Sequence, residues 1–271
     1  MSDLLFSVDN GIARITLNRP DRLNAFSTEM IDLWIDALET VRDSEDIRVV
    51  VLMANGRAFC AGGDVKVMTQ GEGMLYNNTG AGDQVSTGLA RKNTLWKRVQ
   101  RVPLLLQEID KPVIAVMHGL AVGAGFDMTL ACDIRIAAQS ATFSESYVKA
   151  GIVPGDGGAF FLPRIVGVDK ALELLWTGDS FTAEEAKQLG LVTHVVPDEQ
   201  LNEFADAYVK RLASGPQEVL RFTKRAVYQG LHTDLRTSLD MISSAMAVVT
   251  ELEDYKEGVK AILEKRTPNF K

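Results

Sequence analysis

The sequence predicts an α/β core followed by a helical region. Three predicted strands, 49–54, 113–117 and 133–137, alternate with helical segments, and this alternation implies β/α crossovers. The first of them is fully apolar, as is typical of a strand covered on both faces. Downstream the pattern is helical almost to the end of the chain. We therefore predict an α/β core at 1–197 and a C-terminal helical region at 198–271.

The N-terminal part predicts a hairpin and then an amphipathic helix. Residues 4–8 and 12–17 alternate between apolar and polar side chains on either side of the turn signal Asp9-Asn10-Gly11. Ser27 or Thr28 is placed to cap the helix that follows, whose apolar residues recur at helical spacing.

The C-terminal part predicts one short capped helix and four longer ones. Thr182-Ala183-Glu184-Glu185 is a capping-box pattern. Helical patterns follow at 198–213, 216–230, 234–250 and 253–265. Their apolar side chains could serve a subunit interface or could cover the core; the candidates are Met241, Ile242, Met246, Val248 and Val249.

Composition excludes several classes of protein. The chain has 271 residues, a net charge of −7 and no basic block, which argues against nucleic acid or an anionic membrane as the main partner. No apolar run approaches the roughly 20 residues of a membrane span. The three histidines are scattered, so no metal site is predicted. Cys60 and Cys132 are expected to be reduced thiols in a cytoplasmic protein.

Two glycine-rich turns, at 123–125 and 151–158, stand where a predicted strand or loop runs into a helix. A helix N-terminus leaves backbone N–H groups unpaired, and these groups suit an anion or a developing oxyanion. The alternative is that the glycines only let a helix pack closely on a sheet. A similar turn follows the strand at 49–54.

Carboxylates accompany these turns, notably Asp64, Asp127, Glu145 and Asp156. Two N–H groups from separate turns can together hold one thioester oxygen as it gains negative charge. A single carboxylate then suffices to move a proton at the neighbouring carbon.

Residues 69–93 interrupt the α/β pattern. This segment holds five glycines among polar residues. It is interpreted either as a mobile lid or as a tolerated surface insertion. We expect helix to resume at about Thr94 and to continue to Leu106.

Several motifs, taken in order, resemble the crotonase (enoyl-CoA hydratase/isomerase) superfamily over nearly the whole chain. The resemblance implies a spiral of β/β/α units, C-terminal helices that mediate trimers or paired trimers, and acyl-CoA substrates. Coenzyme A would then be part of the substrate, with no permanently bound cofactor. The motifs are Arg22-Leu23-Asn24-Ala25, Ala58-Phe59-Cys60-Ala61-Gly62-Gly63-Asp64, Lys111-Pro112-Val113-Ile114-Ala115, Gly123-Ala124-Gly125 and Gly151-Ile152-Val153-Pro154-Gly155.

The resemblance assigns expected roles to two groups of residues. The amides of Gly63 and Ala124 would form the oxyanion hole. Lys66 could meet a phosphate of coenzyme A, although a solvated lysine is the ordinary interpretation of one exposed cation. The residues expected along the coenzyme A path are Asn24, Ala25, Ala61, Gly62, Asp64 and Lys66.

The acids depart from the hydratase pattern. That pattern has glutamates where this chain has Asp127 and Tyr147, and tyrosine is a poor base near neutral pH because its ordinary pKa is about 10. Asp156 stands near the position of the single acid used by isomerase members, but it could instead be a helix N-cap. Glu145 is interpreted first as a salt-bridge residue and second as a catalytic candidate.

These residues together predict an acyl-CoA enzyme of the hydratase/isomerase type. Asp156 is expected to move the proton, while Asp127 and Tyr147 orient substrate or water. The alternatives are an acyl-CoA thioester hydrolase and a non-catalytic acyl-CoA-binding protein that has lost the paired glutamates.

Overall fold

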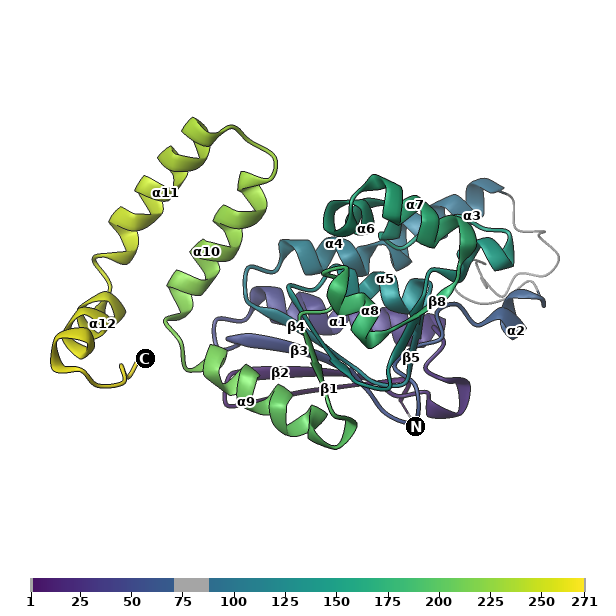
Figure 1. Ribbon diagram of the computed structural model, residues 1–271, viewed down its shortest axis with the longest axis horizontal. Helices are drawn as coiled ribbons and strands as arrows, with labels where there is room; N and C mark the ends of the chain where they lie inside the picture. Colours follow the sequence, from purple (N-terminus) through teal and green to yellow (C-terminus); the bar gives the residue numbers. More distant parts are fainter. Residues whose placement is uncertain (1, 71–87, 271) are drawn as a thin grey trace.

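The computed structural model describes residues 2–70 and 88–270, and its α/β core is built on a six-stranded sheet (Figure 1). The strand order is β1-β2-β3-β4-β6-β9; β1 is antiparallel to β2, and every other neighbouring pair is parallel. The strands are β1 (Leu4–Asp9), β2 (Ile12–Leu17), β3 (Val49–Ala54), β4 (Val113–Met117), β6 (Ile134–Ala138) and β9 (His194–Val196).

A second sheet of three short strands lies beside the first. Its order is β5-β7-β8, and the strands are β5 (Leu120–Val122), β7 (Thr142–Ser144) and β8 (Ser180–Thr182). Each of β4 and β6 is followed by one strand of this second sheet and then by helix. This repeat of β/β/α units is the expected spiral, so the predicted fold class is confirmed.

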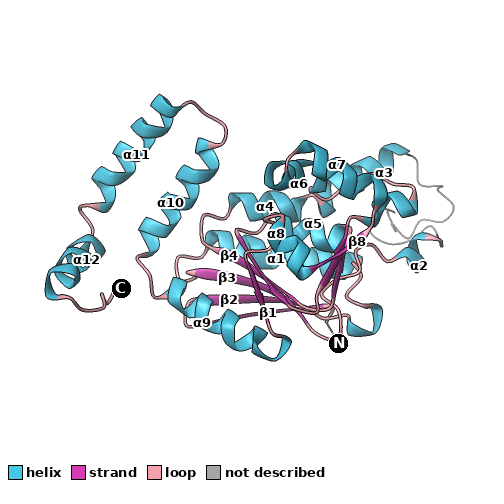
Figure 2. Cartoon of the chain, in the orientation of Figure 1, coloured by secondary structure: helices cyan, strands magenta, loops and turns pink. Residues whose placement is uncertain are grey.

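Helices cover the sheets, as the cyan segments of Figure 2 show. In chain order they are η1 (Pro20–Arg22), α1 (Thr28–Asp43), α2 (Val65–Met68), α3 (Gly88–Thr94), the π-helical η2 (Leu95–Val99), α4 (Arg101–Glu108), α5 (Ala124–Leu130), η3 (Ser146–Ala150), α6 (Gly158–Val166), α7 (Val168–Thr177), α8 (Ala183–Gln188), η4 (Asp198–Gln200), α9 (Leu201–Ala213), α10 (Gln217–Gly230), α11 (Leu235–Val249) and α12 (Glu253–Glu264).

The predicted caps and apolar faces form as the sequence indicates. The side chain of Ser27 accepts a hydrogen bond from the amide of Met30, and Trp34 in the same helix is fully buried. Thr182 and Glu185 form the reciprocal capping box at α8. Cys60 and Cys132 are buried free thiols.

The helix expected from about Thr94 differs from the prediction. It already begins at Gly88, and it passes through a π turn at Leu95–Val99 before α4. A π turn places an extra residue in the helix and shifts its apolar period, so a search for 3.6-residue spacing loses the pattern there. Residues 71–87, which hold most of the proposed lid, lie outside the described residues.

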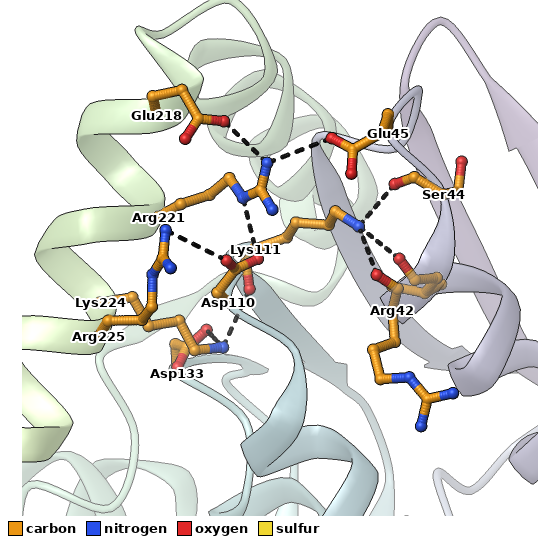
Figure 3. A network of polar contacts seen from close by, with 11 residues as sticks. Arg42, Ser44, Glu45, Asp110, Lys111, Asp133, Glu218, Arg221, Lys224 and Arg225 are labelled. Atoms are coloured by element: carbon orange, nitrogen blue, oxygen red, sulfur yellow. Dashed lines mark hydrogen bonds and ion pairs between the residues drawn. The ribbon is translucent and has the colours of Figure 1, made fainter. Parts of the chain in front are cut away.

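A polar network joins α10 to the core (Figure 3). The buried Lys111 donates to the carbonyl oxygens of Val41, in the last turn of α1, and of the C-cap residue Ser44, at 2.5 and 2.7 Å. Arg221 and Lys224 on α10 pair with Asp110 and Asp133 at 3.0 and 2.7 Å. Carbonyls that α1 leaves unpaired are therefore satisfied by the core, and α10 is attached next to them.

The C-terminal helices lie in two places. Helix α9 packs against β2, β3, β4 and β6, whereas α10, α11 and α12 project away from the core (Figure 1). Neither α10 nor α11 has a buried residue in this single chain. Among the described residues, no helix combines the length and apolarity needed to cross a bilayer.

Candidate active site

A cavity of about 450 Å³ opens between three segments of the core. The segments are the turn after β3 (61–65), the β5–α5 junction (122–124) and the stretch 146–156. Its walls are mostly apolar, and the lining polar side chains include Tyr147 and Asp156. The two glycine-rich turns singled out in the sequence therefore border one cavity.

Close backbone contacts bring the turn after β3 against the start of α5. Cys60 pairs with Ala121 in a parallel bridge. Gly62 has a φ of +80°, and a Cβ on it would lie 2.7 Å from the carbonyl oxygen of Val122 and 3.4 Å from the amide nitrogen of Ala124. Only glycine fits such a position without displacing backbone.

Gly63 and Ala124 both line this cavity, and in the described part of the chain their amides have no backbone acceptor. Ala124 is the first residue of α5, where an amide has no partner within the helix. Gly63 is bridged to Phe26 through the carbonyl of Gly62.

Three of the predicted acid/base residues form one buried group. The Tyr147 hydroxyl lies 2.6 Å from Oδ2 of Asp127 and 3.0 Å from Oδ2 of Asp156. Asp127 comes from α5, Tyr147 from η3, and Asp156 from the loop before α6. Asp156 and Tyr147 line the cavity, while Asp127 is not among the described lining residues and accepts a hydrogen bond from the lining Tyr147.

Burial changes the acidity of each member of this group. Loss of solvent raises the pKa of Asp127 to about 6. Loss of solvent, followed by the charge of Asp127, raises the pKa of Asp156 to about 7. The same two causes raise the pKa of Tyr147 well above its ordinary value, so the phenol remains protonated and acts as a donor. A carboxylate that titrates near neutrality suits general acid/base chemistry.

Asp156 is not the N-cap of the following helix. Gly157, with a φ of +122°, occupies that position, and α6 has no side-chain cap hydrogen bond. The Oδ1 atom of Asp156 has no hydrogen-bond partner within the described part of the chain, and the side chain is almost fully buried at the cavity wall. The helix-cap interpretation is therefore wrong.

The residues expected along the coenzyme A path fall into two sets. Ala61 and Gly62 line the cavity, and Lys66 is exposed on α2. Asn24 is fully buried and donates to the carbonyl oxygens of Asn55 and Ala58, both at 2.8 Å.

Asp64 and Ala25 also make contacts within the protein. Asp64 caps α2 and lies 3.5 Å from Arg19. Ala25 is buried, and its carbonyl oxygen accepts a hydrogen bond from Arg19. Together with Asn24 these residues therefore hold the two loops in place, whatever ligand the loops meet.

A second cavity, of about 300 Å³, adjoins the first at residues 155–156. Gly155 and Asp156 border both cavities. Trp96 and Phe160 give the second cavity an aromatic lining, and Gln100 donates to the carbonyl oxygen of Gly155 at 2.8 Å. The sequence analysis missed these lining residues, because no motif marks them and the π turn hides their spacing.

The comparisons with known proteins agree on one family. The enoyl-CoA hydratase/isomerase family model matches residues 7–271. A 1,2-epoxyphenylacetyl-CoA isomerase from Escherichia coli is 35% identical over all of this chain and 98% of its own length. A crotonyl-CoA hydratase from Syntrophomonas wolfei is 33% identical, with 99% of this chain and 97% of that protein covered.

The fold agrees with this assignment. The crystal structure of an enoyl-CoA hydratase from Bacillus anthracis superposes with a TM-score of 0.87 at 32% identity, and 99% of each chain is covered. Sequence and fold match over the same length, so the likeness is not confined to the glycine-rich turns. The chain therefore belongs to the enoyl-CoA hydratase/isomerase family.

Proposed function

We propose that the protein binds an acyl-CoA, holds the thioester oxygen between the amides of Gly63 and Ala124, and moves a proton at the neighbouring carbon with Asp156. The observation that supports this most directly is that Gly63, Ala124 and Asp156 line one cavity. Donors fixed in advance stabilise the charge of an enolate without having to reorganise. Coenzyme A enters as part of the substrate, so no permanent cofactor is needed.

A double-bond isomerisation is the reaction that this acid set favours. Such a reaction needs one group that removes a proton from one carbon and returns it to another. Hydration by the usual arrangement holds water between two glutamates, and this chain offers Asp127 and Tyr147 in those positions. Tyr147 stays protonated and cannot accept a proton from water near neutral pH. Asp127 and Tyr147 instead orient Asp156 or the substrate.

The acyl group that fits these cavities is uncharged. Across the described residues of both cavity linings there is no lysine, arginine or histidine. The printed names of two relatives specify epoxyphenylacetyl and crotonyl thioesters, whose acyl groups are uncharged, whereas a second Escherichia coli relative is named for a 2,3-dehydroadipyl thioester, which carries a terminal carboxylate. A terminal carboxylate would stay unpaired here and would lose its hydration.

The exposed apolar side chains of the C-terminal helices support assembly into a homotrimer or a dimer of trimers. Leu235 and Leu239 on α11 and Ile262 and Leu263 on α12 are exposed in the single chain. A soluble monomer rarely leaves so much apolar surface uncovered. Light scattering would measure the assembly directly.

A panel of CoA thioesters followed by NMR, which reports the position of the double bond, and by mass spectrometry tests the proposed reaction. Isomerisation leaves the mass unchanged and moves the double bond, whereas hydration adds one water. Release of free CoA thiol would identify a hydrolase instead. Saturable binding without conversion of any CoA thioester that has an uncharged acyl group would contradict the catalytic proposal. It would indicate an acyl-CoA-binding protein instead.

A further inference from the structure

Glu145 is a fully buried carboxyl that the proposed reaction does not use. It occupies the N-cap position of η3, two residues before Tyr147. Neither of its carboxylate oxygens makes a hydrogen bond of good geometry with a described residue, although its side chain interacts with the Asp127 carboxylate. The salt bridge expected from the sequence is absent from the described chain, where no cation pairs with this side chain. A charged carboxylate in that position would be very costly.

The groups that face Glu145 are acids or neutral donors. Among the charged groups Asp127 on α5 acts on it most strongly, and Asp156 from the loop before α6 also acts on it. Tyr147 bridges the two aspartates, and the buried thiol of Cys60 lies near Asp156. Three carboxyls therefore share one buried region without a counter-cation in the described structure. Simultaneous ionisation of all three is excluded by their mutual repulsion.

The surroundings decide which carboxyl keeps its proton. Asp127 accepts a hydrogen bond from Tyr147 and lies against the start of α6, where a Cβ on Gly158 would come within 2.3 Å of its Oδ1. A helix N-terminus favours an anion. Asp156 lies 3.0 Å from the same phenol. Glu145 stands at the N-cap of the short η3 helix but makes no side-chain cap hydrogen bond, and its interaction with Asp127 raises the pKa of Glu145 while lowering that of Asp127.

We propose that Glu145 is a neutral carboxylic acid that confines ionisation to the Asp127–Tyr147–Asp156 group, as a positioning residue for the proton transfer. The inference rests on the proposed function for its catalytic meaning, while the protonation state itself can be measured without turnover. Burial first, and then the charge of Asp127, raise the pKa of Glu145 well above its ordinary value. A second negative charge beside Asp127 would push the pKa of both aspartates higher and deprive the reaction of its base near neutrality.

Isotope-edited infrared spectroscopy tests the protonation state on the ligand-free protein. In the wild type at pH 7, labelling with ¹³C-glutamate is expected to shift an infrared carbonyl band that arises from a neutral carboxylic acid. The Glu145→Gln variant is expected to lack that band. Glu184→Gln, on the exposed start of α8, is the control and should retain it. Absence of any neutral glutamate band in the labelled wild type would overturn the inference, even if the variant does not fold.

The pH profile of kcat/KM tests the positioning role. Glutamine copies a neutral glutamic acid, so Glu145→Gln should leave the midpoint within about 0.3 pH unit of wild type. If Glu145 were charged, its removal would move the midpoint to lower pH by about one unit or more. That shift would contradict the proposal. A wild type that converts no thioester would count against the proposed function, and the infrared result would still decide the state of Glu145.

Discussion

The hydroxyl oxygen of Tyr147 lies 3.0 Å from Oδ2 of Asp156, and it also lies 2.6 Å from Oδ2 of Asp127. A phenol has a single proton, so it donates to one carboxylate at a time. The second short contact is best satisfied when one of the two aspartates is protonated and donates to the phenolic oxygen. The group therefore has one negative charge near neutrality, held where the cavity can use it.

Removal of this phenol is expected to make the base harder to ionise. The hydrogen bond from Tyr147 lowers the pKa of both aspartates, so Tyr147→Phe should move the pH midpoint of kcat/KM from near 7 to higher pH, by about one unit. Tyr228→Phe is a matched control, because it removes a tyrosine–aspartate hydrogen bond of 2.9 Å to Asp133, outside the cavity. An unchanged midpoint in Tyr147→Phe would argue against the coupling.

The raised pKa of Asp156 makes folding stability depend on pH. The folded protein keeps a proton on Asp156 up to a pKa of about 7, whereas the unfolded chain releases it near its ordinary value of 3.8. The contribution of Asp156 to the free energy of unfolding is therefore complete below about pH 4 and is lost as the pH rises through 7. The total loss is on the order of 2–4 kcal/mol. Asp156→Asn should become more stable relative to wild type between pH 5 and pH 8 in urea unfolding. A stability difference independent of pH would contradict the assignment.

The oxyanion hole can be tested by removing one amide hydrogen. Ala124→Pro eliminates the N–H at the first position of α5, where proline is tolerated. The expected loss is about 10²–10³-fold in kcat with folding retained. Val168→Pro is the matched control, since Val168 begins α7 after a glycine with positive φ, as Ala124 does. Equal activity of the two variants would remove Ala124 from the proposed site.

Lys111 is expected to stabilise the end of α1 rather than to take part in the chemistry. Its amine donates to the carbonyl oxygens of Val41, Arg42 and Ser44. Lys111→Met leaves these buried acceptors unpaired and should cost about 2–3 kcal/mol in urea unfolding. The exposed Lys260→Met should change stability by less than about 0.5 kcal/mol. A small effect at Lys111 would show that water replaces the amine.

Long periodic segments were predictable from the sequence. The apolar run at 49–54 forms β3, and the cap at Ser27 and the capping box at Thr182 form as expected. The three strands of the second sheet were missed, because each has three residues and alternation cannot be recognised over so short a length. Their position depends on tertiary pairing.

The candidate site was predictable as a set of residues but not as a geometry. Motif order selected Gly63, Ala124 and Asp127. Spacing alone did not decide whether Asp156 is a catalytic acid or a helix N-cap. It assigned Glu145 to a salt bridge. The outcome depends on the φ of Gly157 and on which side chains meet in the interior. Neither quantity is encoded in a local pattern.

Proton exchange at the carbon next to the thioester tests the central claim most directly. An acyl-CoA whose acyl group is uncharged is incubated in D₂O with wild type, Asp156→Asn and Tyr228→Phe, and deuterium incorporation is followed by NMR. The account predicts exchange with wild type and Tyr228→Phe, and a loss of at least about 100-fold with an Asp156→Asn variant that still binds the thioester. Exchange by Asp156→Asn at the wild-type rate would contradict it.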